Sequence, residues 1–258
     1  MPYLKKSLGQ HFLRDEAIQQ RIADAIGDLS QFETVVEIGP GMGALTKYLV
    51  KGEPKNLYLV ELDDRWAAHL RETYPWMSDR IINEDFLRTD LNKIMRHPTH
   101  VVGNFPYNIS SQIVFKLIDN RDTVAQMTGM FQKEVALRLA AKPSTKDYGV
   151  LTILTQVYFE AKYLFDVPPI CFDPPPKVMS GIVQLFRKTT TLQCDEKRFK
   201  QIVKQAFTMR RKTMRNSLNC FIAGKEIKSD KVFDKRPEEL SIADFEALTN
   251  MIVNSEKT

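Results

Sequence analysis

Short apolar runs rich in β-branched residues alternate with longer amphipathic segments from residue 34 onward. The pattern predicts strands at residues 34–38, 57–62, 80–83, 101–104 and 125–131, with helices in the gaps between them. Strands separated by helices of this length form a parallel sheet through right-handed crossover connections. The chain is therefore expected to have an α/β fold.

Two further apolar runs, at residues 150–159 and 181–187, are predicted to close the sheet as an antiparallel pair after a helix at 134–141. Residues 167–178, which lie between these runs, contain five prolines. Proline fixes the backbone φ angle and removes a hydrogen-bond donor, so this segment is expected to be a stiff loop. Phe172 lies between the two groups of prolines and is predicted either to fill the core beneath the loop or to serve a site that the loop positions.

The composition changes after Lys188, where three consecutive threonines lead into a segment with helical patterns only. We expect a domain boundary there, with one domain at residues 1–188 and a small all-helical domain at residues 189–258.

Basic residues are concentrated in this helical tail. From Lys197 to Arg215 it holds eight lysines and arginines and no acidic residue. Solvated surfaces usually mix both signs, so the stretch is predicted to bind phosphates. If the helix is continuous, one face carries Lys200, Lys204, Arg211 and Arg215. The full set predicted to contact a nucleic acid is Lys200, Lys204, Arg210, Arg211, Lys212 and Arg215, and Lys5, Lys6 and Arg14 are expected to extend it.

Overall charge and cysteine content narrow the class of protein further. Lysine and arginine number 37 against 32 aspartates and glutamates, giving a net charge of +5 and a pI near 9.0, which suits a polyanionic partner. The three cysteines are too widely spaced for a disulfide framework or a zinc site, and no metal is expected. No signal peptide is evident, nor an apolar run of the roughly 20 residues that cross a bilayer. We expect a cytoplasmic protein without a membrane segment.

A glycine-rich turn follows the first predicted strand, in the sequence Val-Val-Glu-Ile-Gly-Pro-Gly-Met-Gly at residues 35–43. Its glycines lack the Cβ atoms that would block a ligand, and the helix that should begin at about Ala44 offers free amide groups. Gly39, Gly41 and Ala44 also satisfy the fingerprint of dinucleotide-binding proteins, so a nicotinamide or flavin cofactor is an alternative at this point.

Acidic side chains lie at the ends of the next two predicted strands. Glu61 comes 22 positions after Gly39, where a carboxylate can accept hydrogen bonds from both hydroxyls of an adenosine ribose. Asp85 ends the third strand, where a carboxylate can accept from the amine of adenine. This ordered set suits S-adenosylmethionine better than a dinucleotide.

The fourth strand runs into Asn104-Phe105-Pro106-Tyr107, which combines an amide, a carbonyl and an aromatic ring. The exocyclic amine of adenine is a poor nucleophile because its lone pair is delocalised into the ring. An enzyme must therefore hold this amine with acceptors and clamp the base against a π-surface. Asn104, the Pro106 carbonyl and Tyr107 are predicted to do so, on a loop that the proline stiffens. The alternative is an ordinary turn with a buried tyrosine.

Together these motifs make the chain resemble the ribosomal RNA adenine dimethyltransferases nearly from end to end. The segment Lys6–Leu13 looks like that family's Gly-Gln-Asn-Phe-Leu segment, and Phe172–Val178 looks like its Phe-x-Pro-Pro-Pro-Lys-Val signature. The basic stretch at residues 207–218 is similar to the housekeeping branch that acts on the small ribosomal subunit. The resemblance implies a Rossmann-like class I methyltransferase sheet with a small C-terminal all-helical domain.

The resemblance also implies S-adenosyl-L-methionine as the cofactor and assigns residues to the site. The residues implied for the cofactor are His11, Leu13, Gly39, Gly41, Glu61, Asp85 and Asn104. The residues implied for catalysis are Asn104, Pro106, Tyr107 and Phe172, with the last covering the adenine face opposite Tyr107. The substrate would be two adjacent adenosines in the 3′-terminal hairpin of small-subunit ribosomal RNA. The partner would be the immature small subunit, bound by a monomer that contributes to its biogenesis.

Two positions depart from the family pattern. His11 stands where the family more often has asparagine, but histidine can also donate one hydrogen bond and accept another. Phe105 stands where leucine is usual, and a bulkier apolar residue is expected to be tolerated.

Three other functions compete with this interpretation. A large-subunit adenine methylase would share the chemistry but is not expected to carry the basic tail. A non-catalytic ribosome-assembly factor would not need Asn104 or Tyr107, yet both are present. A dinucleotide-dependent oxidoreductase would use the same glycine turn.

Overall fold

The computed structural model describes residues 11–256, which divide into two compact units. The first unit contains the chain up to Ala136 together with Glu160–Arg187, and the second contains Leu137–Phe159 together with the chain from Lys188 onward. Residues 137–159 thus belong to the same unit as the helical tail, which begins where the composition changes at Lys188. Residues Lys5–Gln10, which the sequence assigns to the N-terminal motif and to the basic surface, lie outside the described part.

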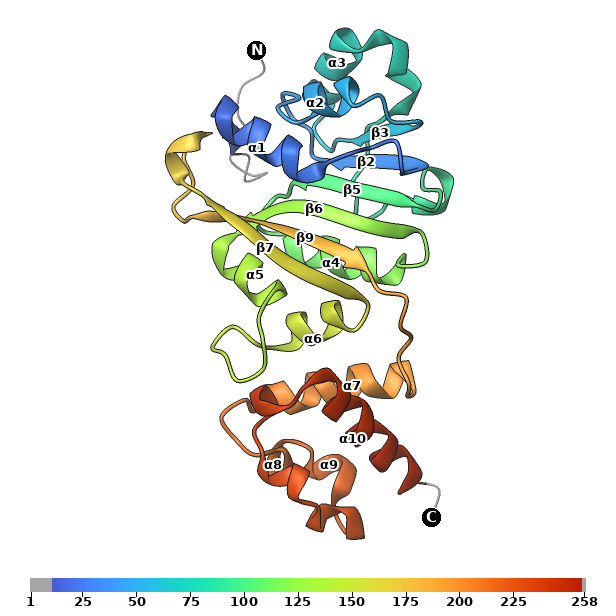
Figure 1. Ribbon diagram of the computed structural model, residues 1–258, viewed down its shortest axis with the longest axis vertical. Helices are drawn as coiled ribbons and strands as arrows, with labels where there is room; N and C mark the ends of the chain where they lie inside the picture. Colours follow the sequence, from blue (N-terminus) through green and yellow to red (C-terminus); the bar gives the residue numbers. More distant parts are fainter. Residues whose placement is uncertain (1–10, 257–258) are drawn as a thin grey trace. The chain divides into compact units, whose positions relative to one another are not determined.

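A seven-stranded mixed sheet dominates the first unit, in the order β4-β3-β2-β5-β6-β9-β7 (Figure 1). The strands from β2 to β6 pair in parallel, and β9 pairs with β6 in the antiparallel direction. The predicted parallel sheet is therefore confirmed. Its strands are β2 (Thr34–Ile38), β3 (Leu57–Val60), β4 (Ile81–Ile82), β5 (Thr99–Asn104), β6 (Val124–Gln132), β7 (Phe159–Val167) and β9 (Ser180–Arg187).

The prediction of a strand at residues 150–159 is wrong, because this run contains the helix α6 (Val150–Gln156). Four consecutive residues of α6, at positions 152–155, are buried. A short helix that is buried all round shows no 3.6-residue period, so its β-branched residues resemble a strand. The strand beside β9 is instead β7, which was missed because it lies at the sheet edge and carries charged residues such as Glu160 and Lys162.

The helices of the first unit connect successive parallel strands or flank the series of strands at its start and end. They are α1 (Glu16–Ile26), α2 (Thr46–Lys51), α3 (Asp64–Thr73), α4 (Ser110–Asp119) and the start of α5 (Lys133–Leu139). Aspartates cap two of them, since Asp15 accepts from the backbone N–H of Ile18 and Asp63 from that of Arg65. The turn after β2 extends through Leu45. Helix α2 therefore begins at Thr46, two residues later than the expected start at Ala44.

A second, two-stranded sheet joins distant parts of the first unit. Strand β1 (Phe12–Leu13) pairs antiparallel with β8 (Phe172–Asp173), with Leu13 opposite Phe172. Strand β8 follows the short 3-10 helix η4 (Pro169–Cys171) within the proline-rich loop. The loop is therefore tied to the chain segment that precedes α1.

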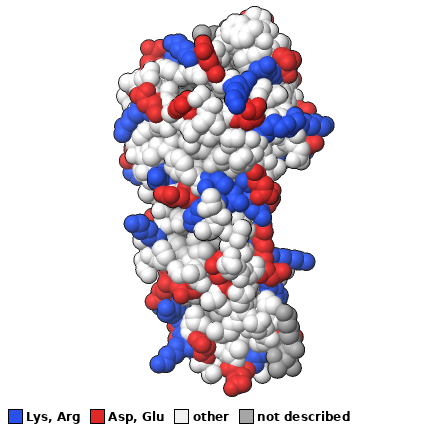
Figure 2. Space-filling view, turned by 45° about the vertical axis from the view of Figure 1, so that its right-hand side comes forward, with Lys and Arg blue, Asp and Glu red and all other residues white. Residues whose placement is uncertain are grey.

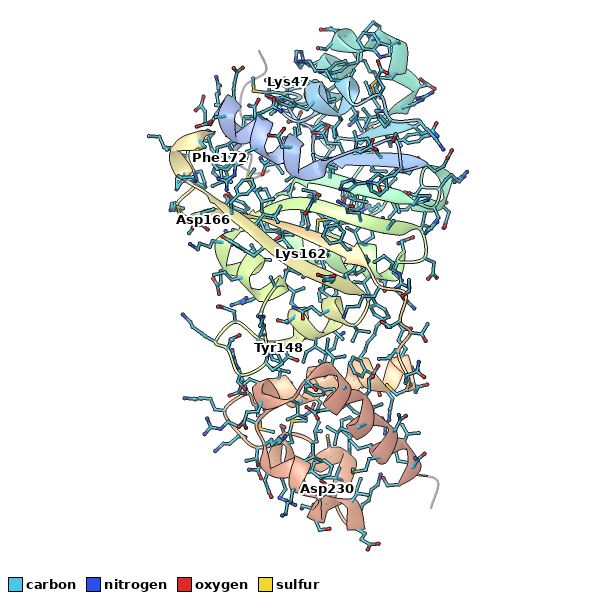
Figure 3. The ribbon with its side chains drawn as sticks, viewed as in Figure 1. Lys47, Tyr148, Lys162, Asp166, Phe172 and Asp230 are labelled. Carbon is cyan, nitrogen blue, oxygen red and sulfur yellow. The ribbon has the colours of Figure 1, made fainter. Side chains whose placement is uncertain are left out.

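The second unit is helical in its described part. Its main helices after Lys188 are α7 (Glu196–Thr208), α8 (Met214–Ser217), α9 (Asn219–Ile222) and α10 (Ile242–Asn254). The predicted apolar stripe of α7 is buried at Phe199, Ile202 and Val203. Tyr148 donates a hydrogen bond to the carbonyl of Leu240 over 2.9 Å, within the same unit (Figure 3).

The basic stretch at residues 197–215 is not one continuous helix. Helix α7 ends at Thr208, and α8 begins only at Met214, after Thr213 takes an extended backbone conformation. The four basic residues expected on one face therefore do not share a helix face. Within residues 11–256, no helix is long and apolar enough to cross a membrane.

Candidate functional site

A pocket opens where the neighbouring strands β2 and β5 end. Ile38 pairs with Gly103, so Gly39 and Asn104 follow side by side. Strands β3 and β4 lie on one side of β2 while β5 and β6 lie on the other, and open α/β sheets bind ligands at this reversal of strand order. The cavity measures about 210 Å³. The predicted site residues that line it are His11, Leu13, Gly39, Gly41, Glu61, Asp85, Asn104, Pro106 and Tyr107.

The glycine turn forms one wall of the pocket. Gly39 and Gly41 have φ angles of +65° and +54°, a region that side chains with a Cβ rarely adopt. A Cβ on Gly39 would lie 4.0 Å from the Asn104 carbonyl oxygen, in the space between the two strand ends. A Cβ on Gly41 would lie only 2.8 Å from Cε1 of Phe12. Both positions therefore need glycine for geometric reasons.

Glu61 connects the glycine turn to the end of β3. Its Oε2 accepts from the Gly41 backbone N–H and its Oε1 from that of Asp63, each over 2.9 Å. Burial raises the pKa of Glu61, and these two backbone hydrogen bonds oppose the rise. Each carboxylate oxygen has another lone pair, which remains suitable for a hydroxyl donor in the pocket.

Asp85 lies on the loop that follows β4. Its Oδ1 accepts from the Leu87 backbone N–H over 2.9 Å. Lys116 of α4 fixes this loop from behind, because its Nζ donates to the carbonyls of Phe86 and Thr89, both over 2.6 Å. Burial lowers the pKa of Lys116. The sequence interpretation did not include Lys116 in the site.

Glu37 also lines the pocket and was missed from the sequence. Its carboxyl is buried within β2 and accepts a hydrogen bond from the Thr46 hydroxyl over 2.6 Å. Burial raises the pKa of Glu37 to about 8. A single acid inside the apolar run Val-Val-Glu-Ile was the signal that could have identified it.

Backbone contacts from His11 fix the orientation of the Asn104 amide. Asn104 Nδ2 donates to the His11 carbonyl over 3.0 Å. Because a carbonyl only accepts hydrogen bonds, the amide nitrogen must face His11 and the oxygen Oδ1 must face away from it. Asn104 therefore presents an acceptor. The Pro106 carbonyl accepts one hydrogen bond, from the Ile109 N–H, and keeps its second lone pair.

Tyr107 brings its ring to the same pocket. The ring stacks on His11 with a centroid separation of 5.6 Å and an interplanar angle of 27°. Its hydroxyl lies 2.6 Å from the Ser180 hydroxyl. Burial raises the pKa of Tyr107, so the phenol is neutral at physiological pH. The alternative of a simple buried tyrosine does not fit, because the residue is only partly buried and lines the cavity.

Phe105 is accommodated by two glycines in adjacent strands. Gly103 of β5 pairs with Gly129 of β6. A Cβ at these glycines would lie 2.5 Å and 2.3 Å from the Phe105 ring, so the ring occupies the space that two side chains would take. The ring is buried and packs edge-on against Phe131, at a centroid separation of 5.1 Å. This explains how the bulkier residue fits behind the catalytic loop.

Phe172 is the one predicted catalytic residue that does not line the described pocket. Its side chain is only 4% exposed and belongs to the core cluster that includes Leu13. Figure 3 shows it close to the end of β7, beyond Asp166. Its pairing partner in the two-stranded sheet, Leu13, does line the pocket. The role of Phe172 in covering a bound base therefore stays a prediction.

The proline-rich loop instead holds the N-terminal side of the pocket. His11 Nδ1 lies 2.8 Å from the Pro174 carbonyl, so this ring nitrogen carries the proton and donates. The Arg14 backbone N–H donates to the Cys171 carbonyl over 2.8 Å. Arg14 also forms an ion pair with Asp173, at 2.7 Å. The residue that orients Asn104 is thus fastened to a stiff loop.

The described lining of the pocket is acidic, with four acidic residues and neither lysine nor arginine. The acids are Glu37, Glu61, Glu84 and Asp85. Glu37 is mostly protonated near pH 7 because burial raises its pKa to about 8, and the other three acids suit a cationic ligand.

The basic residues of the second unit fall into two groups. Several are paired with residues from elsewhere: Lys200 with Glu196, Arg215 with Asp234, and Arg210 with the carbonyls of Thr145 and Lys146. In contrast, the side chains of Lys204, Arg211 and Lys212 are exposed. In the lower part of Figure 2, basic side chains (blue) are interspersed with acidic ones (red). Acids from outside the stretch therefore offset part of its charge.

Comparison with known proteins connects this site to an enzyme family. The family model described as ribosomal RNA adenine dimethylase matches residues 2–252. The protein named ribosomal RNA small subunit methyltransferase A from Flavobacterium johnsoniae is 47% identical over 250 residues, which cover 96% of this chain and 95% of that protein.

Two solved structures share the fold. A dimethyladenosine transferase from Plasmodium falciparum superimposes with a TM-score of 0.81 at 24% identity, covering 95% of this chain and 98% of that one. The 23S rRNA methyltransferase ErmE gives a TM-score of 0.68 at 29% identity, covering 93% of this chain and 99% of that one. The predicted class I methyltransferase sheet followed by C-terminal helices is confirmed.

Proposed function

The chain belongs to the ribosomal RNA adenine dimethylase family, and from this premise we propose that it dimethylates two adjacent adenosines near the 3′ end of small-subunit ribosomal RNA. The observation that carries the proposal is the fixed orientation of Asn104. Its amide nitrogen is engaged by the His11 carbonyl, so Oδ1 is available to accept from the amine of a target adenine. The Pro106 carbonyl and the Tyr107 ring lie in the same pocket.

The cofactor of this reaction is S-adenosylmethionine in our proposal. The acidic lining suits its positive sulfonium and ammonium groups, Glu61 keeps lone pairs for ribose hydroxyls, and Gly39 leaves the space that a Cβ would fill. His11, Leu13, Gly41, Asp85 and Asn104 complete the set that would hold it. Membership of the dimethylase family argues against the dinucleotide alternative.

The chain's own residues prepare the amine for attack. Asn104 Oδ1 and the Pro106 carbonyl would accept its two N–H groups, localise its lone pair and stabilise the positive charge that develops on nitrogen. Stacking on Tyr107 would hold the base in one plane. When bound, S-adenosylmethionine supplies a methyl carbon: the amine lone pair forms the C–N bond, the sulfur keeps the electrons of the broken C–S bond, and the nitrogen releases one proton to water. Holding the reactants together lowers the barrier by roughly 7 to 11 kcal/mol in well-oriented systems.

The small subunit is the target that the relatives favour. Identity to the small-subunit methyltransferase is 47%, against 29% to the 23S rRNA enzyme, and both matches extend over nearly the whole chain. A large-subunit methylase is therefore the weaker alternative. A purely non-catalytic assembly factor would leave the geometry of Asn104 and Tyr107 without a purpose.

RNA binding is assigned to both units in this proposal. The first, methyltransferase unit would take the target base, and the second, helical unit would contact phosphates through Lys204, Arg211 and Lys212, whose side chains are exposed. Lys200, Arg210 and Arg215 were predicted for the same role, and their existing partners make them weaker contributors. The enzyme would act as a monomer on immature small subunits in the cytoplasm and contribute to their biogenesis.

Mass spectrometry of nucleosides tests the proposal. The purified protein is incubated with S-adenosylmethionine and small subunits that lack the modification, with large subunits in parallel. Dimethyladenosine in the small subunit is expected from the wild type and not from Asn104→Ala. Product in large subunits only would establish the large-subunit alternative. No methylated adenosine, despite measured binding of cofactor and particle, would favour the assembly factor.

A further inference from the structure

Ser180 is a buried polar residue to which the proposed reaction gives no role. It is the first residue of β9, its exposure is 0%, and its hydroxyl lies 2.6 Å from the hydroxyl of Tyr107. Tyr107 and Ser180 are 73 positions apart in the chain. A serine hydroxyl buried at this depth needs a partner, and the Tyr107 hydroxyl supplies it.

The backbone around Ser180 forms a firm anchor. Ser180 pairs with Gln132 across β6 and β9, and the Lys133 N–H donates to the Met179 carbonyl over 2.9 Å. At the next position, a Cβ on Gly181 would lie 2.8 Å from the Tyr163 ring, so the strand is packed tightly there. The Ser180 hydroxyl is therefore a fixed point against which a side chain can be held.

Tyr107 is held at both ends. Its backbone carbonyl accepts from the Ser110 hydroxyl over 3.1 Å, while Ser180 holds the hydroxyl at the far end of the ring. The ring itself is only half-buried and faces His11 on one side. Without the Ser180 hydroxyl, the Tyr107 ring would lose the contact that fixes its orientation.

We propose that Ser180 is a positioning residue that holds the Tyr107 ring as a stacking platform, and that the second methyl transfer depends on it more than the first. The inference rests on the proposed function. A primary amine offers two N–H groups to Asn104 Oδ1 and the Pro106 carbonyl. After one methylation only one N–H remains, so one of these acceptors loses its donor. The orientation of the base then depends more strongly on stacking against Tyr107.

The test compares Ser180→Ala, Tyr107→Phe and the double variant, with mono- and dimethyladenosine quantified over time in small subunits. Tyr107→Phe keeps the ring but breaks the same hydrogen bond, so it carries the test if Ser180→Ala folds poorly. Tyr163→Phe is the matched control, because it removes a nearby tyrosine hydroxyl that bonds Asp166 rather than the pocket. S-adenosylmethionine affinity and melting temperature are measured for each protein.

The single variants are expected to raise the ratio of mono- to dimethyladenosine by about threefold to tenfold, as the loss of one hydrogen bond implies. The double variant should go no further than either single one, since both break one interaction. Tyr163→Phe should keep the wild-type ratio. An unchanged ratio in Ser180→Ala, or additive effects in the double variant, would overturn the inference. A wild type that makes no methylated adenosine would instead overturn the proposed function, and this inference with it.

Discussion

The two sides of the pocket are built differently, although both lie at the strand ends of the same parallel sheet. On the cofactor side, the Gly41 N–H and the Glu61 carboxylate bond across 20 positions of sequence, within one strand-turn-helix-strand segment. On the target-base side, Asn104 is fixed from 93 positions away and Tyr107 from 73. The cofactor wall is local in sequence, and the base-holding wall is assembled from distant segments.

This difference separates the two functions that we propose for the pocket. The cofactor wall depends on backbone conformation and buried carboxylates, so its substitutions should change cofactor affinity. The base-holding wall depends on single hydrogen bonds that orient side chains, so its substitutions should change the rate of transfer with the cofactor still bound.

Asn104→Asp should give the largest loss. Aspartate keeps an acceptor oxygen but cannot donate to the His11 carbonyl, and a carboxylate facing that carbonyl is repelled. Methyl transfer is expected to slow by about 10- to 100-fold, since a partly buried carboxylate would face the His11 carbonyl without a donor between them. Single-turnover assays with saturating cofactor measure the rate. Asn92→Asp makes the same charge change at an exposed position of the 3-10 helix Leu91–Lys93 and should retain the wild-type rate. An Asn104→Asp enzyme of normal rate would contradict the orientation argument.

Gly41→Ala should weaken cofactor binding without a specific defect in transfer at saturation. The new Cβ would lie 2.8 Å from Phe12 at a φ of +54°, so either the turn or Phe12 must move. We expect the Kd for S-adenosylmethionine to rise by about tenfold, which corresponds to about 1.4 kcal/mol. Gly27→Ala is the matched control, because Gly27 also has a positive φ, +75°, but nothing lies within 4 Å. Calorimetric titration of both variants should show weaker binding for Gly41→Ala only.

The double variant Lys204→Gln/Arg211→Gln should weaken RNA binding severalfold while both sides of the pocket stay intact. Both side chains are exposed and carry charge in the second unit. Each lost phosphate contact should flatten the slope of log affinity against log salt by about 0.7 to 0.9. Filter binding to a small-subunit hairpin at several salt concentrations measures this slope. Lys55→Gln, which removes a lysine paired with Glu33, should leave it unchanged. If the double variant also keeps the wild-type slope, those residues do not contact phosphate.

Glu37→Gln should have the smallest effect on transfer and a clear effect on the pH dependence of stability. The Glu37 pKa rises from 4.5 to about 8 on folding because of burial. A carboxyl with a raised pKa destabilises the folded state progressively as pH increases from the lower value to the higher one. The wild type should therefore lose about 5 °C more in melting temperature than the variant between pH 6 and 9. Glu72→Gln, on the exposed face of α3, should follow the wild type. Parallel curves for wild type and Glu37→Gln would refute this assignment.

Most of the candidate site was predicted from local sequence motifs. The glycine turn, Glu61 and Asp85 were identified because each lies at the end of a predicted strand, and the ends of parallel strands meet at one edge of a sheet. The loop from Asn104 to Tyr107 was identified because its residue types are rare in combination. The strand boundaries agreed within about two residues for most of the parallel sheet.

Residues that act through distant partners were missed. No local sequence motif marks Ser180, because its proposed role depends on a hydrogen bond with Tyr107, which is 73 positions away in the chain. The partner of Arg215, Asp234, lies 19 positions away and was missed, whereas Glu196 pairs with Lys200 at i,i+4 spacing and could have been identified from the sequence. Phe172 was predicted to cover the base through resemblance alone; its ring is buried beside Leu13, and the prediction remains untested.

The sequence by itself determined the parallel sheet, the strand ends that line the pocket and the chemistry of the Asn104 loop. These follow from hydrophobic period, from glycine and proline geometry, and from functional groups that are close together in the chain. The tertiary structure decided which way the Asn104 amide faces, what holds the Tyr107 ring, and whether the run at residues 150–159 is a helix or a strand. Each of these depends on burial and on single hydrogen bonds between segments that only folding brings together.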